Sequence, residues 1–495
     1  MTLTESLAET IGASGIEAGK ADVRSLGAAM AAGKLTAAEL TAFYLDRIAR
    51  LNPSLRAVIT TAPQAPAEAA ASDTRRAAGA TLGPLDGLPV LIKDNVSVDG
   101  SPATAGSPAL ERAAGVDAFL VARLRAAGAV IIGKANLSEW ANFRSRPSSS
   151  GLSTLGGQAV NPHGTGRTPS GSSSGSAVAV AAGLAPLTIG SETDGSIVSP
   201  SSACGVVGIK PTLGLVSRTG VVPISAAQDT AGPMTRTVAD AAALLSVIAG
   251  ADPADAPTAD AAGNVCDYTQ HLDPAALEGA RLGVWRAGAE PDDRAAIVEL
   301  MNAAIVALKR SGAEVIDPVE LRDVDRIGEP EIAALTVEFK HDINAYLAGL
   351  GGEHPADLRG LIEFNTRNGA VVLEHFGQEL FEAAEATSGD LSEPGYLESR
   401  LAATRLARGA IDSALIAHRL DAVIAVTGHP ARLTDLVMGD AHGWGSSGPA
   451  AVSGYPSITV PAGQVRGLPV GLSFIGPAWS EPRLIALAHA FELAR

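Results

Sequence analysis

Apolar residues recur at helical spacing in the first part of the chain. Between residues 17 and 51 the apolar positions fall three or four residues apart, which predicts two consecutive helices. Thr36 comes directly before the second periodic stretch, and Glu39 follows three residues later, which is the spacing of a capping box. We therefore expect the second helix to begin just after Thr36.

Short continuous apolar runs alternate with helical patterns further along the chain. Residues 88–92 and 129–132 predict buried strands, and residues 116–127 between them have a helical period. A strand, a helix and a strand in succession indicate a βαβ unit and hence the α/β class.

The same alternation returns in the second half. It predicts strands at residues 281–285, 313–316, 421–426, 457–460 and 470–474, and helices near 292–311 and at 481–493. Residues 330–420 read as largely helical, and residues 252–263, rich in Pro, Asp and Ala, are the best candidate for a linker. Because the alternation persists to the end without a repeat of fixed period, we expect one large α/β domain.

Composition narrows the class of protein and its partners. Charged residues make up 18% of the chain and apolar residues 46%, which excludes intrinsic disorder. The 37 basic and 53 acidic residues give a net charge of −16, which disfavours nucleic acid and anionic membranes as partners. The longest weakly polar run, residues 177–189, is shorter than the ~20 residues of a membrane span. With no secretory signal pattern in the sequence, we expect a cytoplasmic protein.

A Ser- and Gly-rich segment in the middle of the chain is unusually poor in charge. Residues 145–202 contain 15 Ser, as a flexible linker would, but apolar runs at 177–182 and 204–209 lie inside or beside them. Residues 150–235 contain only six charged side chains. We interpret this segment as part of the protein interior.

Lys93 ends the apolar run 88–92, which places it at the carboxyl end of a predicted buried strand. Ligands of open α/β sheets bind at that end. A lysine at a strand end often simply reaches solvent. If Lys93 is instead desolvated, its pKa falls and a neutral amine becomes available as a general base.

Other catalytic patterns are weaker. Ser173 is the centre of a Gly-x-Ser-x-Gly match, but a nucleophile elbow must follow a strand, and residues 162–169 contain two prolines. No phosphate-binding loop is complete, and the nine histidines and two cysteines lack the spacing of metal ligands. We therefore expect no metal and no organic cofactor.

Several ordered segments resemble the amidase signature family. The main ones are Gly-Arg-Thr-Pro-Ser-Gly-Ser-Ser-Ser-Gly-Ser-Ala (166–177), Gly-Ser-Glu-Thr-Asp-Gly-Ser-Ile (190–197) and Cys-Gly-Val-Val-Gly-Ile-Lys-Pro-Thr (204–212). Further matches run in order over roughly residues 25 to 493, at 87–95, 133–141, 229–234, 454–461 and 467–474. The resemblance implies one amidase domain over residues 1–495, with a central mixed, largely parallel β-sheet covered by helices. Within it we expect a helical N-terminal segment (1–60), a core with the catalytic residues (85–240) and a helical substrate-cleft region (330–420).

The resemblance also implies a Ser–Ser–Lys triad. Ser196 matches the nucleophile, and Lys93 matches the base. Ser172 matches the bridging serine, which family members hold after a cis peptide bond, here the bond from Gly171. A base is needed because a serine hydroxyl is a poor nucleophile until its proton is removed.

The same resemblance places an oxyanion hole at the backbone N–H groups of Thr193, Asp194, Gly195 and Ser196. The chain departs from the family pattern at Asp194, where Gly is usual, and two residues after the nucleophile it has Val in place of the usual Arg. Asp194 either contacts the substrate or caps a turn, and the sequence leaves both interpretations open. A third departure is a Ser in place of Gly at position 174, which puts a tight turn there in doubt.

The segments 190–198, 214–225, 228–234 and 477–482 are most similar to the bacterial peptide amidase branch of the family. That resemblance implies a hydrolase that releases ammonia from C-terminal peptide amides through an acyl-enzyme. It also implies a small peptide or small-molecule amide as substrate, and we expect a monomer. Alternatives are the glutaminase-type component of an amidotransferase, a small-molecule amidase and a non-catalytic binding scaffold, against which the intact triad argues.

Overall fold

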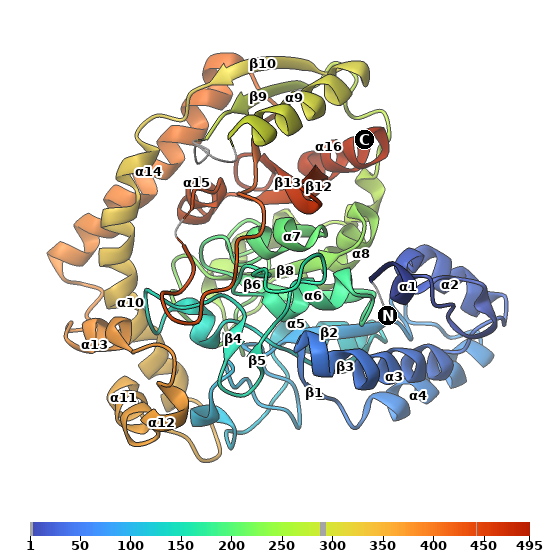
Figure 1. Cartoon of the computed structure of the whole chain (residues 1–495), viewed down its shortest axis with the longest axis horizontal. Helices are drawn as coiled ribbons and strands as arrows, with labels where there is room; N and C mark the ends of the chain where they lie inside the picture. The colour runs from blue at the N-terminus through green and yellow to red at the C-terminus, as the bar shows by residue number, and fades with distance from the viewer. Residues whose placement is uncertain (1–2, 288–293, 442) are drawn as a thin grey trace.

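The fold is built around one eleven-stranded β-sheet that gathers strands from nearly the whole chain (Figure 1). The computed structural model describes residues 3–287, 294–441 and 443–495. In order across the sheet, the strands are β1 (Val58–Thr61), β3 (Val130–Ala135), β2 (Pro89–Lys93), β6 (Leu187–Glu192), β8 (Thr230–Thr235), β7 (Val207–Lys210), β12 (Ser457–Val465), β13 (Leu468–Ile475), β11 (Ala422–Val426), β9 (Arg281–Trp285) and β10 (Glu314–Val319). A small hairpin, β4 (Leu152–Ser153) and β5 (Gly157–Gln158), lies outside it.

The sheet is mixed, as expected. Strand β2 runs parallel to β3 and β6, and β9 runs parallel to β10 and β11. The other six neighbouring pairs are antiparallel, and β8, β7 and the hairpin of β12 and β13 lie between the two parallel blocks. The α/β class with a mixed central sheet is therefore confirmed.

Helices cover the sheet and form a further layer at one side. They are α1 (Leu3–Leu7), α2 (Val23–Ala31), α3 (Ala37–Leu55), α4 (Ala65–Ala77), α5 (Phe119–Ala126), α6 (Ser174–Ala181), α7 (Val198–Cys204), α8 (Val238–Ile248), α9 (Arg294–Arg310), α10 (Gly328–Ala348), α11 (Leu358–Arg367), α12 (Gly369–Val372), α13 (Glu379–Glu385), α14 (Pro394–His418), α15 (Ser447–Ser453) and α16 (Glu481–Ala494). Residues 292 and 293 of the helix predicted near 292–311 lie outside the described residues, and α9 accounts for the rest. None of the helices described is both long and apolar enough to cross a membrane.

The start of α3 is the capping box that the sequence predicts. The Thr36 hydroxyl accepts a hydrogen bond from the backbone N–H of Glu39 at 3.0 Å. The Glu39 carboxylate accepts one from the backbone N–H of Thr36 at 2.8 Å. Two N–H groups that the first turn would leave unpaired are thus satisfied.

The expected linker at residues 252–263 is wrong. Its second half forms a 3₁₀ helix, Ala256–Gly263, in which Thr258 and Ala261 are buried. The Thr258 hydroxyl accepts a hydrogen bond from the backbone N–H of Asp252 at 2.7 Å. The small side chains that make this segment look like a linker instead let its backbone pack closely on the domain.

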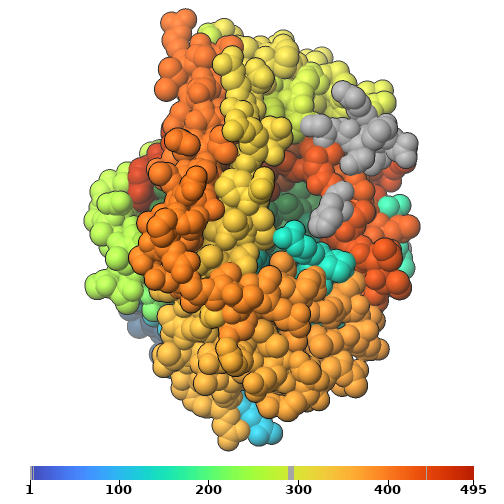
Figure 2. Space-filling view, turned by 90° about the vertical axis from the view of Figure 1, so that its left-hand side faces the viewer, coloured from blue at the N-terminus to red at the C-terminus, as the bar shows by residue number. Residues whose placement is uncertain are grey.

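The helices α10, α11 and α13 share a second apolar core, separate from the core around the sheet, and α14 packs through two smaller clusters. In the second core the Trp140 ring meets Phe381 edge-on at 5.4 Å between centroids, and Phe143 lies 4.9 Å from Phe339. Figure 2 shows these helices, coloured yellow to orange, covering most of one face of the molecule. The aromatic contacts hold that layer against the loop that carries Trp140 and Phe143.

Candidate active site

Lys93 is the last residue of β2, as predicted, and its side chain is completely buried. Its Nζ lies 2.7 Å from the Ser172 hydroxyl, 2.9 Å from the Ser191 hydroxyl and 3.1 Å from the Ser191 carbonyl oxygen. The alternative of a strand-end lysine reaching solvent is therefore wrong. The parallel neighbours β2 and β6 bring Lys93 and Ser191 together because both residues lie at the carboxyl ends of their strands.

Burial lowers the pKa of Lys93 to about 7, against smaller upward effects from the charges of Glu192 and Asp229. The three partners of the amine are compatible with the neutral form. Two N–H groups can donate to the oxygens of Ser191, and the lone pair is then left to accept the proton of Ser172. Near neutral pH the amine can therefore act as a base.

Lys210 is a second buried lysine with different partners. Its Nζ donates to the carbonyl oxygens of Tyr455 at 2.6 Å, Ala450 at 3.2 Å and Pro211 at 3.3 Å. A carbonyl can only accept, so three carbonyls around one amine require three N–H donors and hence the ammonium form. Burial also lowers the pKa of Lys210, to about 8, but its surroundings favour the charged form.

Ser172 is buried between Lys93 and the turn that leads into α6. The peptide bond from Gly171 to Ser172 is cis, as the resemblance implies. A Cβ on Gly171 would lie 2.3 Å from the Ser138 hydroxyl, so only glycine fits there. Ser174, where glycine is usual in the family, is accommodated because its hydroxyl donates to the carbonyl oxygen of Ser170 at 2.6 Å.

Ser196 follows Gly195 in a turn between β6 and α7, and 8% of its surface is exposed. Gly195 has φ of 77°, a left-handed conformation that favours glycine. The backbone N–H of Ser173 donates to the carbonyl oxygen of Ser196 at 3.1 Å, which holds the two serine-bearing turns together. Within the described residues no hydrogen bond joins the hydroxyls of Ser172 and Ser196, so only the Lys93–Ser172 contact of the predicted relay is formed.

The four backbone N–H groups from Thr193 to Ser196 are available to a ligand. None of them donates a hydrogen bond to another of the described residues. Thr193, Asp194 and Ser196 line the same cavity, and Gly195 is buried in the turn between them. Free N–H groups beside a nucleophile are what an oxyanion site requires.

Glu192 is a functional candidate that sequence reasoning missed. Its carboxylate accepts hydrogen bonds from the backbone N–H groups of Ile197 at 2.7 Å and Val198 at 3.0 Å. Glu192, the residue before the turn, is therefore hydrogen-bonded to the residues at the end of the turn, which holds the segment that contains Ser196 closed. In the sequence, Glu192 is marked only as a rare acid in the charge-poor stretch and as part of the family-like segment 190–197, and neither feature indicates that its carboxylate holds the turn.

Ser196 opens into a cavity of about 440 Å³ with acidic and apolar walls. The charged side chains that line it are Asp194, Glu331, Asp440 and one cation, Arg146, and the apolar lining consists of Ala141, Phe143, Ile224, Ile332, Leu335, Leu380 and Ala441. Asp194 is exposed, and no backbone N–H of its turn donates to its carboxylate within the described residues. The turn-capping interpretation of Asp194 is therefore unsupported, and its carboxylate lines the cavity and accepts a hydrogen bond from the Ser447 hydroxyl at the start of α15.

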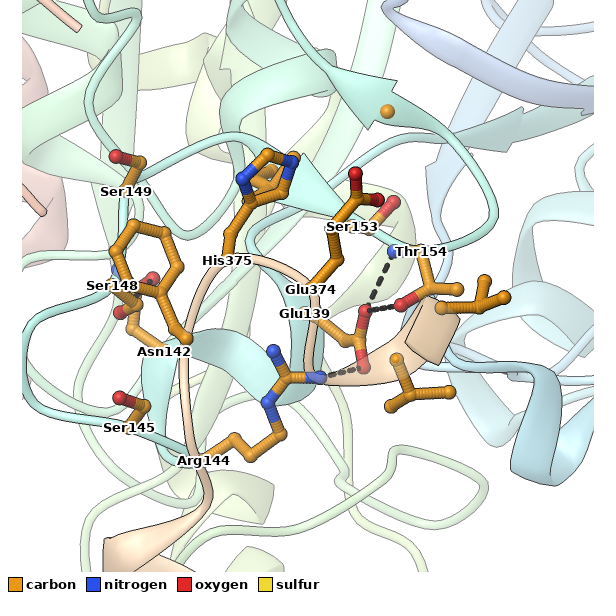
Figure 3. A pocket seen from close by; sticks show the side chains of 15 residues that line it. Glu139, Asn142, Arg144, Ser145, Ser148, Ser149, Ser153, Thr154, Glu374 and His375 are labelled. Atoms are coloured by element: carbon orange, nitrogen blue, oxygen red, sulfur yellow. Dashed lines mark hydrogen bonds and ion pairs between the residues drawn. The ribbon is translucent and has the colours of Figure 1, made fainter. Parts of the chain in front are cut away.

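A second cavity of about 160 Å³ adjoins the first and shares Asn142 and Ser148 with it. Figure 3 shows the Glu139 carboxylate in this cavity bonded to the backbone and hydroxyl of Thr154 and paired with Arg144. The charges of Glu139 and Arg144 thus neutralise each other. None of Lys93, Ser172 and Ser196 lines the second cavity. The chemistry is thus centred on the larger one. Within the described ranges, no three His, Cys, Asp or Glu side chains are grouped to hold a metal ion.

The chain is similar to known proteins over most of its length. The family described as Amidase matches residues 39–485. The crystal structure of native peptide amidase from Stenotrophomonas maltophilia is 49% identical, covers 96% of each chain and superimposes with a TM-score of 0.91.

Two sequence relatives extend the comparison. A probable amidase of Arabidopsis thaliana is 41% identical over 93% of this chain and 87% of its own length. The A-type component of a glutamyl-tRNA(Gln) amidotransferase from Roseiflexus is 37% identical over 94% of both chains. The chain therefore belongs to the amidase signature family and is an enzyme that hydrolyses carbon–nitrogen amide bonds.

Proposed function

We propose that this enzyme removes ammonia from the C-terminal carboxamide of short peptides. The observation that carries the proposal is the contact of 2.7 Å between the buried amine of Lys93 and Ser172, next to a Ser196 that faces a cavity of about 440 Å³. The likeness to a peptide amidase at 49% identity supports the choice of substrate.

The proposed acylation uses Ser196 as nucleophile and Ser172 as bridge. Neutral Lys93 accepts the proton of Ser172, and Ser172 accepts the proton of Ser196 as its oxygen attacks the amide carbon. The N–H groups at 193–196 stabilise the oxyanion of the tetrahedral intermediate. The C–N bond then breaks, the same relay returns a proton to the leaving nitrogen, and ammonia departs.

Deacylation repeats these steps with water in place of Ser196. The relay takes a proton from water as its oxygen attacks the ester carbon of the acyl-enzyme. Collapse of the second tetrahedral intermediate releases the peptide acid and returns a proton to the Ser196 oxygen. The reaction balances as peptide amide plus water giving peptide acid plus ammonia.

The test is ammonia release from a panel of dipeptide and tripeptide amides, free amino-acid amides and glutamine, by the wild type and by Ser196→Ala. We expect the peptide amides to have the highest kcat/KM and the variant to lose at least ~10³-fold. Peptide amides that release no ammonia while another amide is turned over would refute the choice of substrate.

A second candidate is the glutaminase-type component of an amidotransferase, because a curated relative named as such a component is 37% identical over 94% of both chains. Glutamine turnover that depends on added partner proteins would favour it. We propose instead a monomer that is active alone.

A further inference from the structure

The side-chain amide of Gln228 uses both of its donors and its oxygen next to the turn that carries Ser196. Gln228 is fully buried just before β8. Its Nε2 donates to the carbonyl oxygen of Thr193 at 2.9 Å and to the carboxylate of Glu331 at 2.7 Å. Its Oε1 accepts from the guanidinium of Arg400 at 3.0 Å. Gln228 begins the segment 228–234 that resembles peptide amidases, but the resemblance implies no role for its side chain, and no motif marks Arg400.

Arg400 determines which way this amide points. A guanidinium can only donate, so the oxygen of Gln228 must face Arg400 and the nitrogen must face Thr193. Arg400 is itself held in α14 by Glu338 of α10, through bonds of 2.7 Å from Nε and 2.5 Å from Nη2. Glu338 is 1% exposed and also accepts from the Ser225 hydroxyl at 2.6 Å.

The bond to Thr193 bears on the oxyanion site through the geometry of one peptide group. The carbonyl of Thr193 and the N–H of Asp194 belong to the same planar unit, and in a trans peptide they point in opposite directions. A donor that holds the carbonyl therefore sets the direction of the N–H. The Thr193 side chain is held independently, because its hydroxyl donates to Asp229 at 2.5 Å.

We infer that Gln228 and Arg400 are positioning residues that aim the Asp194 N–H at the oxyanion, with Arg400 acting through Gln228. The inference rests on the proposed function, because it assumes that an oxyanion forms beside Ser196. It assigns a part in the chemical step to α14 and to α10, the second of which also lines the cavity.

Steady-state kinetics on a peptide amide test the inference with Gln228→Met, Arg400→Lys and the double variant. Gln228→Met keeps the length of the side chain but removes its hydrogen-bond donors. Arg400→Lys keeps the positive charge beside Glu338 but removes the planar guanidinium that also reaches Gln228. We expect each single variant to lower kcat about ten- to a hundredfold with KM changed less than about threefold. This is less than the ~10²–10³ for outright loss of an oxyanion donor. The double variant should lose no more kcat than Gln228→Met alone.

Two inhibition constants distinguish a loss of kcat caused by the oxyanion site from a loss of kcat caused by poor folding. A peptide aldehyde forms a hemiacetal with the nucleophile and places its oxygen at the oxyanion site, whereas the peptide acid product does not. We expect the variants to weaken the aldehyde as strongly as they lower kcat and to leave the acid unchanged. The ratio of the two constants does not depend on the folded fraction. Arg405→Lys, on an exposed position of the same helix, is the matched control.

Additive losses of kcat in the double variant, or single variants that raise KM at unchanged kcat, would overturn the inference. The proposed function would still stand if the wild type releases ammonia from peptide amides and Ser196→Ala does not. Equal weakening of aldehyde and acid would overturn it in the same way. A wild type that releases ammonia from no peptide amide would overturn the proposed function and this inference together.

Discussion

Lys93 and Lys210 are both buried, yet their partners give the two amines different chemistry. Lys93 meets two hydroxyls and a carbonyl, and Lys210 meets three carbonyls. The candidacy of Lys93 could be predicted from its place at the end of an apolar run. Ser172 and Ser196 could not be told from the 15 serines of their segment by composition or spacing, and their roles were expected only from the family resemblance.

Activity should have an acidic limb near pH 7. The pKa of Lys93 is lowered to about 7, so below that pH the amine is protonated and cannot accept the proton of Ser172. We expect kcat/KM to fall about tenfold per pH unit below the limb and to level off above it. A profile that stays flat down to pH 5, measured as ammonia release, would rule out a neutral lysine base. Lys93→Met is the control and should be inactive throughout.

Removing the charge of Asp194 should change substrate binding more than catalysis. The carboxylate faces the cavity, whereas the proposed oxyanion donor is the backbone N–H, which Asp194→Asn retains. We expect kcat to stay within about threefold. KM should rise about two- to fivefold for peptide amides with a free α-ammonium group and less for their N-acetylated forms, as for a partly exposed ion pair. Equal KM changes for both kinds of substrate would contradict this role.

At the scale of elements, the turn from β6 to α7 is held by side chains to which the family resemblance assigns no role. The Glu192 carboxylate accepts hydrogen bonds from the backbone at the end of the turn. Gln228 and Asp229, just before β8 in the chain, form hydrogen bonds with the carbonyl and the hydroxyl of Thr193. The strands β6 and β8 beside the turn were not predicted, because Thr, Ser, Gly and Pro interrupt their apolar runs. The side chains that form hydrogen bonds with the turn could not be predicted either, because the order of strands in the sheet is what brings them beside it.

Glu192→Gln should move the acidic limb to lower pH. The negative charge of Glu192 raises the pKa of Lys93, and an amide at this position keeps an oxygen for the N–H groups of Ile197 and Val198. We expect a shift of roughly half a unit to one unit in the pH profile of kcat/KM. Glu481→Gln is the matched control, a buried carboxylate whose charge acts on Lys210 instead. A limb that stays in place or moves upward in Glu192→Gln would contradict the assignment.

The helices α10 to α14 were the least predictable elements. Residues 330–420 read as helical, but their place beside the site depends on an aromatic cluster contributed by distant segments, Trp140 and Phe143 on one side and Phe339 and Phe381 on the other. A pairing between such distant segments leaves no periodic signal. The structure brings Glu331, Ile332, Leu335 and Leu380 of this layer into the cavity wall.

At the scale of the whole molecule, all the residues that the proposed reaction needs come from one chain. The triad candidates, the free N–H groups and the cavity walls lie within the described ranges of a single protein. We expect light scattering after size exclusion to give the mass of one 495-residue chain, and the same fraction to release ammonia from peptide amides. Activity that appears only after partner proteins are added would support the amidotransferase alternative.

The proposed reaction requires an acyl-enzyme in which the acyl group is bound to Ser196. Intact-mass spectrometry of the enzyme quenched during turnover of a slow peptide ester or amide tests it most directly. If Ser196 is the nucleophile, the mass increases by that of the acyl group less the hydroxyl hydrogen it replaces, the adduct lies on the peptide that contains Ser196, and Ser196→Ala shows none. An adduct on another residue, or a Ser196→Ala variant that still forms the adduct and releases product, would contradict it.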